Sequence, residues 1–169
     1  MIEVKRIIPE CNADTLLVEL IMQRGKPGHR NGKTEVLKAL EEFDDDTRFI
    51  IGLIDSDKFK RTYNYCDEFT ITREDKVTDQ GLLIKQHSNS NKYLIFVCPA
   101  FEKWILQLAE ENGINPSDYG YDSFESLCNA SKRNEIREDK DFKKFVNAVI
   151  QKNPPAIATL KRWFEKVFE

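Results

Sequence analysis

The stretch Phe49-Ile50-Ile51-Gly52-Leu53-Ile54-Asp55-Ser56-Asp57 is the most informative segment of the chain for the fold. A nearly unbroken apolar run of this length is typical of a strand that is buried on both faces of a parallel sheet. The run ends in two aspartates, and open parallel sheets bind their ligands at the carboxyl ends of the strands. The segment therefore predicts an α/β fold and places a candidate site directly after this strand.

The residues upstream predict a second strand and a helical crossover. Residues 3–8 read as a strand, and an apolar helix follows that either Asn12 or Asp14 can cap. Thr34 can cap a further helix. A helix-containing connection between two strands is the usual link between parallel neighbours. We therefore expect strand 3–8 to lie parallel to the apolar strand and beside it.

This arrangement brings three carboxylates to one edge of the sheet. Glu10 follows the first strand, and Asp55 and Asp57 follow the second. Such a cluster resists full ionisation unless a cation lies among its members. Hard oxygen ligands of this type suit Mg²⁺ or Mn²⁺. The alternatives are local: the dipole of the next helix would favour Glu10, and Asp55 could simply end the strand and cap a turn.

A fourth acid depends on the direction of a later strand. Residues 82–86 and 93–98 read as a hairpin, with a short strand expected at 68–72. Pro99 then opens a helix that carries Glu102 in its first turn. If strand 93–98 runs parallel to the first two, Glu102 joins the metal site. The helix dipole would favour a glutamate at this position in any case.

The loop before the helix at Thr34 resembles a phosphate-binding loop in part. Gly28-His29-Arg30-Asn31-Gly32-Lys33-Thr34 is one residue too short for a Walker A motif, and a helix is expected before it. His29, Arg30 and Lys33 nevertheless precede a helix N-terminus, which is a natural place for a phosphate. A solvated basic loop is the alternative.

The remainder of the chain, from about residue 114, is predicted to be helical. Its apolar residues recur at helical spacing, so its aromatic side chains are expected to form core rather than to stack on bases. Residues 131–169 hold ten Lys/Arg and six Asp/Glu, a net charge of +4, and residues 1–130 carry the remaining −7. The basic part could meet a phosphate backbone, or its charges could simply be a solvated face. We divide the chain into an α/β domain, 1–113, and a helical extension, 114–169, packed on it.

Composition excludes several classes of protein. No apolar run approaches the roughly 20 residues that cross a bilayer, and the N-terminus lacks the apolar stretch of a signal peptide. The four cysteines form no Cys-x-x-Cys pair, which argues against a zinc ribbon. We expect a cytoplasmic protein with no membrane association.

Three segments together resemble a known family. Pro9-Glu10-Cys11-Asn12-Ala13-Asp14-Thr15-Leu16 resembles the first Toprim motif, in which a strand ends in Glu before a helix. The segment from Ile51 to Asp57 resembles the second motif, Asp-x-Asp. Val97-Cys98-Pro99-Ala100-Phe101-Glu102-Lys103-Trp104 resembles the Phe-Glu-x-Trp segment of the small RloB-like bacterial relatives. The resemblance covers about residues 3–110.

The resemblance implies a fold, a cofactor and a reaction. Toprim domains are three-layer, Rossmann-like sheets flanked by helices, and they occur in topoisomerases, primases and overcoming-lysogenization-defect nucleases. By this resemblance Asp55 and Asp57 would ligate Mg²⁺, Glu10 would be a general base or acid or a further ligand, and Lys58 would offset phosphate charge. The implied function is a nuclease, with a role in bacterial defence.

Two other functions stay open at this stage. The chain could be a non-catalytic nucleic-acid-binding or adaptor subunit that works beside a larger protein partner. It could also be a nucleotide-binding phosphotransferase that uses the Gly28–Thr34 loop.

Overall fold

The computed structural model of the chain describes residues 4–56, 64–71, 78–88 and 90–169. Its centre is a five-stranded mixed sheet with the strand order β1-β2-β5-β4-β3. The first three strands in this order are mutually parallel, and the last two are antiparallel to their neighbours. The strands are β1 (Ile7–Pro9), β2 (Ile50–Asp55), β3 (Phe69–Ile71), β4 (Leu82–His87) and β5 (Lys92–Val97). The α/β class and the parallel, adjacent pairing of β1 with β2 are thereby confirmed.

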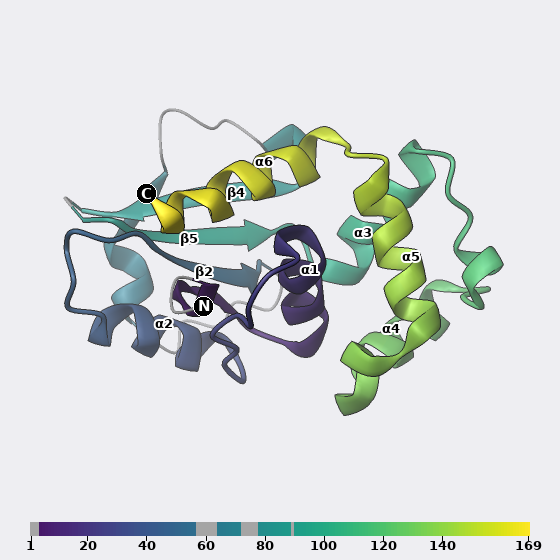
Figure 1. The fold of residues 1–169 in the computed structure, drawn as a ribbon, viewed down its shortest axis with the longest axis horizontal. Coiled ribbons are helices and arrows are strands. Elements are labelled where there is room, and N and C mark those ends of the chain that lie inside the picture. The colour runs from purple at the N-terminus through teal and green to yellow at the C-terminus, as the bar shows by residue number, and fades with distance from the viewer. Residues whose placement is uncertain (1–3, 57–63, 72–77, 89) are drawn as a thin grey trace.

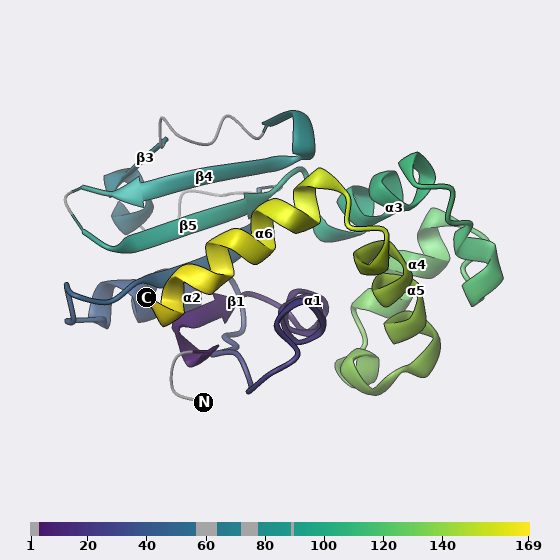
Figure 2. The same ribbon diagram turned by 45° about the horizontal axis from the view of Figure 1, so that its top comes forward.

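Helices cover both faces of this sheet. One face carries α6, which lies lengthwise over β5 and the neighbouring strands (Figure 2), and the other carries α2 (Figure 1). The remaining helices gather beyond the carboxyl ends of the parallel strands (Figure 1). The helices are α1 (Asn12–Met22), α2 (Lys33–Glu42), α3 (Phe101–Glu111), α4 (Phe124–Ser131), α5 (Lys140–Gln151) and α6 (Pro155–Glu165). No helix in the described part of the chain is both long and apolar enough to span a bilayer.

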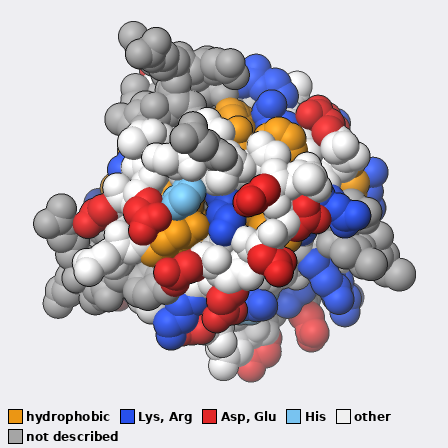
Figure 3. Space-filling view, turned by 90° about the vertical axis from the view of Figure 1, so that its left-hand side faces the viewer, with side chains coloured by type: hydrophobic (Ala, Val, Ile, Leu, Met, Phe, Trp, Pro, Cys, Tyr) orange, Lys and Arg blue, Asp and Glu red, His pale blue; other side chains and the backbone are white. Residues whose placement is uncertain are grey.

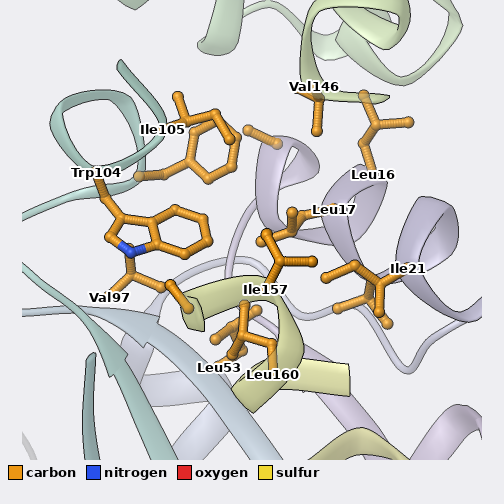
Figure 4. Packing of buried hydrophobic residues seen from close by; sticks show 14 of the residues in the cluster. Leu16, Leu17, Ile21, Leu53, Val97, Trp104, Ile105, Val146, Ile157 and Leu160 are labelled. Carbon is orange, nitrogen blue, oxygen red and sulfur yellow. The ribbon is translucent and has the colours of Figure 1, made fainter. Parts of the chain in front are cut away.

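The larger of two apolar cores joins the sheet to the C-terminal helices. Figure 4 shows side chains of α1, α3 and α6 converging on Leu53 of β2 and Val97 of β5. Ile157 and Leu160 of α6 are at most 2% exposed in this cluster. The extension therefore completes the core of the sheet instead of forming a core of its own.

The smaller core lies between α2 and the opposite face of the sheet. It contains Val36 and Leu40 of α2 together with Ile54 and Leu94. Gly52 allows this close approach, because a Cβ atom there would lie 2.8 Å from the Val36 side chain. The glycine inside the apolar run is thus explained by packing.

Polar contacts tie the two ends of the chain to this framework. The Arg6 guanidinium donates to the carbonyl oxygen of Phe49, at 2.9 Å, and to that of Val167. Arg137, in the extension, forms an ion pair with Glu19 of α1. The contacts of Arg6 with Val167 and of Glu19 with Arg137 join the N-terminal part of the chain to residues more than a hundred positions away.

Element starts differ from the expectations in three places. Val4–Arg6 form a 3-10 turn, so only Ile7–Pro9 of the expected strand 3–8 is extended. Cys11 caps α1, because its sulfur accepts a hydrogen bond from the Asp14 amide, and neither Asn12 nor Asp14 does so. The next helix begins at Lys33 with Gly32 as its N-cap, so Thr34 is not the cap.

The end of the molecule where the parallel strands begin has a mixed surface. Figure 3 shows acidic and basic side chains interspersed over this end, with small apolar areas between them. Alternation of this kind favours solubility over the capture of one charged ligand. The candidate site lies at the other end of the strands.

Candidate functional site

Three of the expected acids line one cleft at the carboxyl edge of the sheet. Glu10 follows β1, Asp55 ends β2, and Glu102 lies in the first turn of α3, which follows β5. The cleft has a volume of about 680 Å³ and is lined by all three side chains. β5 is parallel to β2, and the helix that follows β5 therefore brings Glu102 to the same cleft as Glu10 and Asp55.

Backbone hydrogen bonds orient the two carboxylates on the adjacent strands. The Glu10 amide donates to the Leu53 carbonyl at 3.0 Å, which extends the β1–β2 pairing by one residue. The Asp55 amide donates to Glu10 Oε2 at 3.1 Å, so the glutamate side chain lies across the end of β2. Glu10 and Asp55 are therefore neighbours in a defined geometry.

Asp55 also has a structural role at the start of α3. Its Oδ1 accepts a hydrogen bond from the Phe101 amide at 3.0 Å. Ala100, the N-cap residue of α3, has no side chain that could make this bond. A carboxylate is favoured at this position by the helix dipole. Asp55 thus caps a helix from a neighbouring strand while it lines the cleft.

Glu102 is fixed by the helical extension. The hydroxyl of Ser131, at the end of α4, donates to Glu102 Oε1, and Ser131 is only 6% exposed. The serine lies 29 positions further along the chain. The extension therefore both closes the cleft and orients one of its acids.

A buried carboxyl group, Asp14, lies close to these acids. It is fully buried, its Oδ2 accepts from the Cys11 thiol at 3.0 Å, and its Oδ1 has no hydrogen-bond partner within the described structure. The pKa of Asp14 is raised to about 7. Burial is the main cause, the charges of Glu10 and Glu102 add to the rise, and the hydrogen bond from Cys11 opposes it. Sequence reasoning missed this residue except as a cap.

A signal for Asp14 does exist in the sequence. Leu17, Val18 and Ile21 follow it at i+3, i+4 and i+7, the spacing of one helix face, and all three are buried. An aspartate on the apolar stripe of a helix is an anomaly that points to a buried carboxyl.

The basic loop between α1 and α2 runs along the free edge of β1. The amides of Gly28, Arg30 and Gly32 donate to the carbonyls of Ile7, Pro9 and Glu10. The loop thus pairs with the side of a strand. A phosphate-binding loop instead leads from the end of a strand into a helix. Asn31 and Gly32 line the acidic cleft.

The three residues expected to bind phosphate do not line this cleft. His29 is hydrogen-bonded at both ring nitrogens, to the Thr15 hydroxyl at 2.8 Å and to Asn31 Oδ1 at 2.9 Å. Arg30 is exposed, and Lys33 is the half-buried first residue of α2. The histidine thus holds the loop against α1.

The thiols of the cleft are poor nucleophiles. Cys11 and Cys128 both line it. Burial is the main cause that raises the pKa of each thiol, and nearby acids, Asp14 for Cys11 and Glu102 for Cys128, raise it further. Because the thiolate is the reactive form, the cleft does not favour covalent cysteine chemistry.

The carboxylates have the chemistry of a divalent-cation site, but they do not form a complete one in the described residues. Within residues 4–56, 64–71, 78–88 and 90–169, no three His, Cys, Asp or Glu side chains are grouped so as to hold a metal ion. Asp57 and Lys58, two of the expected site residues, lie outside these ranges. The oxygen ligands that are present fit Mg²⁺, which commonly keeps several waters and uses one or two carboxylates.

Comparisons of the chain with protein-family models, with curated proteins and with solved structures give no match. The geometry of the cleft is therefore the basis for a functional proposal.

Proposed function

We propose that the chain is an Mg²⁺- or Mn²⁺-dependent nuclease whose sheet has a Toprim-like arrangement. One observation carries the proposal: Glu10, Asp55 and Glu102 come from three neighbouring parallel strands and their connections, and they line one cleft. Acids that converge from distant parts of a chain are costly to bring together unless the site uses their charge. A cation that also binds phosphate is the simplest use.

The ligand set follows from the ends of the strands. Asp55 and Asp57 would hold the cation, with Glu10 or Glu102 as a further ligand and with water or phosphate oxygens completing the shell. When bound, such a cation neutralises charge on a phosphodiester and makes water easier to deprotonate. This scheme requires only two protein carboxylates at a time.

The remaining roles belong to the side chains of the chain itself. Glu10, oriented by the Asp55 amide, can accept a proton from an attacking water when it is not a ligand. Asp55 stays in place through its bond to the Phe101 amide. Lys58 follows the aspartates in sequence and would offset charge on the scissile phosphate.

The test combines metal binding with cleavage. Mg²⁺ and Mn²⁺ are titrated by calorimetry into the wild-type chain, Asp55→Asn and Asp57→Asn, and each protein is then assayed on single-stranded DNA, duplex DNA and RNA. Asn keeps an oxygen that can accept from the Phe101 amide, so Asp55→Asn should fold while its cation binding and cleavage are lost. Asp118→Asn is the matched control, since Asp118 is exposed and lies outside the cleft lining. Cleavage that survives in pure Asp55→Asn would sink the proposal.

A non-catalytic adaptor is the second candidate. The observation that favours it is that two of the acids have structural partners: Asp55 accepts from the Phe101 amide, and Glu102 accepts from the Ser131 hydroxyl. An adaptor would bind nucleic acid equally well as wild type and as Asp55→Asn, and no metal would give turnover with either protein. The same titrations and assays therefore separate the two functions.

A further inference from the structure

One wall of the acidic cleft comes from α4 of the helical extension. Phe124, Cys128, Ser131 and Lys132 line the cleft, and we call these four residues the α4 wall. The first three lie at i, i+4 and i+7, so they share one face of the helix. The hydrogen bond from Ser131 to Glu102 fixes this face against α3 (Figure 1 shows the two helices). The wall is thus a fixed part of the cleft.

Phe124 is the unusual member of the α4 wall. It is 43% exposed, and no other large hydrophobic side chain in the described structure is as exposed. By contrast, Phe142 and Phe145 of the neighbouring helix α5 are completely buried in the core. An exposed ring in a cleft whose other walls carry charge indicates a ligand that has both an apolar face and charged groups.

Two lysines supply positive charge beside this ring. Lys103 of α3 and Lys132 of the α4 wall both line the cleft, and both are exposed. Neither ammonium group forms an ion pair or a hydrogen bond within the described structure. They are therefore available to an anionic group of a ligand, while the carboxylates at the sheet edge remain for a cation.

We infer that the cleft binds an unpaired nucleotide of a nucleic-acid strand, with its base stacked on Phe124 and its flanking phosphates contacting Lys103 and Lys132. The inference rests on the proposed function, because it takes nucleic acid as the substrate, and it adds a preference for single strands. In a duplex each base is covered by its neighbours, so a base must be unpaired or extruded to stack on a protein ring. The cleft volume of about 680 Å³ lies in the range for one small-molecule ligand.

The experiment measures binding apart from cleavage. Fluorescence anisotropy, in EDTA and again with Ca²⁺ in place of Mg²⁺, follows the binding of labelled dT12, rU12, a dT12 strand with abasic sites throughout, and a 12-base-pair duplex to the full-length chain. Phe124→Ala should weaken dT12 binding by about 5- to 100-fold, the usual loss for one stacked base. Phe124→Trp should bind as wild type, and Phe124→Leu should resemble Phe124→Ala because it keeps an apolar side chain but has no ring.

Two further arms test the phosphate contacts and the base. Lys103→Gln and Lys132→Gln should each make the salt dependence of dT12 binding shallower by about one counterion or slightly less. The abasic strand should bind wild type and Phe124→Ala equally. Thermal unfolding of each variant, expected to be unchanged at these exposed positions, shows that it folds.

The outcomes separate this inference from the proposed function. Single-strand binding that depends on Phe124, without metal-dependent cleavage, supports the inference and removes the nuclease. Cleavage that is indifferent to Phe124 and equal on single strands and duplex supports the nuclease and overturns the inference. Failure of wild type to bind any of the oligonucleotides, or binding of poly-glutamate alone, would also overturn it, the latter in favour of an acidic protein segment.

Discussion

Asp14 is a carboxyl group with no exposed surface, one thiol donor and two other acids nearby. Burial raises its pKa from 3.8 to about 7 in the folded chain. Between these pH values the folded state keeps a proton that the unfolded state has released, so stability falls as pH rises from about 4 to about 7. A difference of about three pKa units lowers the free energy of unfolding by about 4 kcal/mol at most.

This dependence can be isolated with one variant. In Asp14→Asn the side chain is neutral at every pH, so we expect its free energy of unfolding to lack the contribution that wild type loses between pH 4 and pH 8. Urea unfolding at each pH gives the free energy of unfolding of both proteins. Subtracting one from the other removes the contribution of groups that titrate alike in the two proteins. Asp118→Asn, at an exposed carboxylate, is the matched control. A pH-independent difference for Asp14→Asn would mean that Asp14 titrates normally.

At the scale of elements, the contact between α2 and β2 depends on a single glycine. A Cβ atom at Gly52 would lie 2.8 Å from Val36, 2.9 Å from Leu94 and 3.0 Å from Leu40, all of them fully buried. Gly52→Ala should therefore overpack this core and destabilise the chain by about 1–3 kcal/mol. Glu35→Ala, on the exposed side of α2, should change stability little.

A second substitution tests the cause. Val36→Ala removes the nearest methyl groups, so the double variant Gly52→Ala/Val36→Ala should be more stable than the sum of the two single losses predicts. Urea unfolding of the four proteins gives the coupling energy directly. Strict additivity would show that the cost arises from the strand backbone and not from contact with α2.

Some of these elements and site residues could be predicted from the sequence, and others could not. Strand β2 and the acids at its end and after β1 were predictable, because apolar runs and parallel crossovers are local patterns with a known geometric result. The α1 cap was not, because Cys11 is an unusual cap and Asp14 is turned inward. Phe124 and Ser131 were missed for another reason: their place beside Glu102 depends on how two distant helices pack.

At the scale of the whole molecule, the extension and the sheet share one core. Phe142, Phe145, Ile157, Leu160 and Trp163 of the extension are each at most 3% exposed in the cluster that includes α1 and the sheet. Removal of a single large core side chain commonly costs about 2–5 kcal/mol, and a domain is stable by only about 5–15 kcal/mol. Residues 1–113 alone should therefore show no cooperative thermal unfolding.

The fragment has a built-in reporter, because Trp104 is its only tryptophan and is 2% exposed in the full chain. In residues 1–113 its fluorescence emission should shift to the red, and addition of a separate 114–169 fragment should restore both the emission and a cooperative transition. The cation binding that we propose for the acidic cleft should return with it, since Ser131 orients Glu102 only when the extension is docked. A 1–113 fragment that unfolds cooperatively with a buried Trp104 would show instead that the sheet is a domain on its own. The acidic site would then be complete without the α4 wall. The fragment would keep the proposed metal binding and would lose the preference for single-stranded nucleic acid.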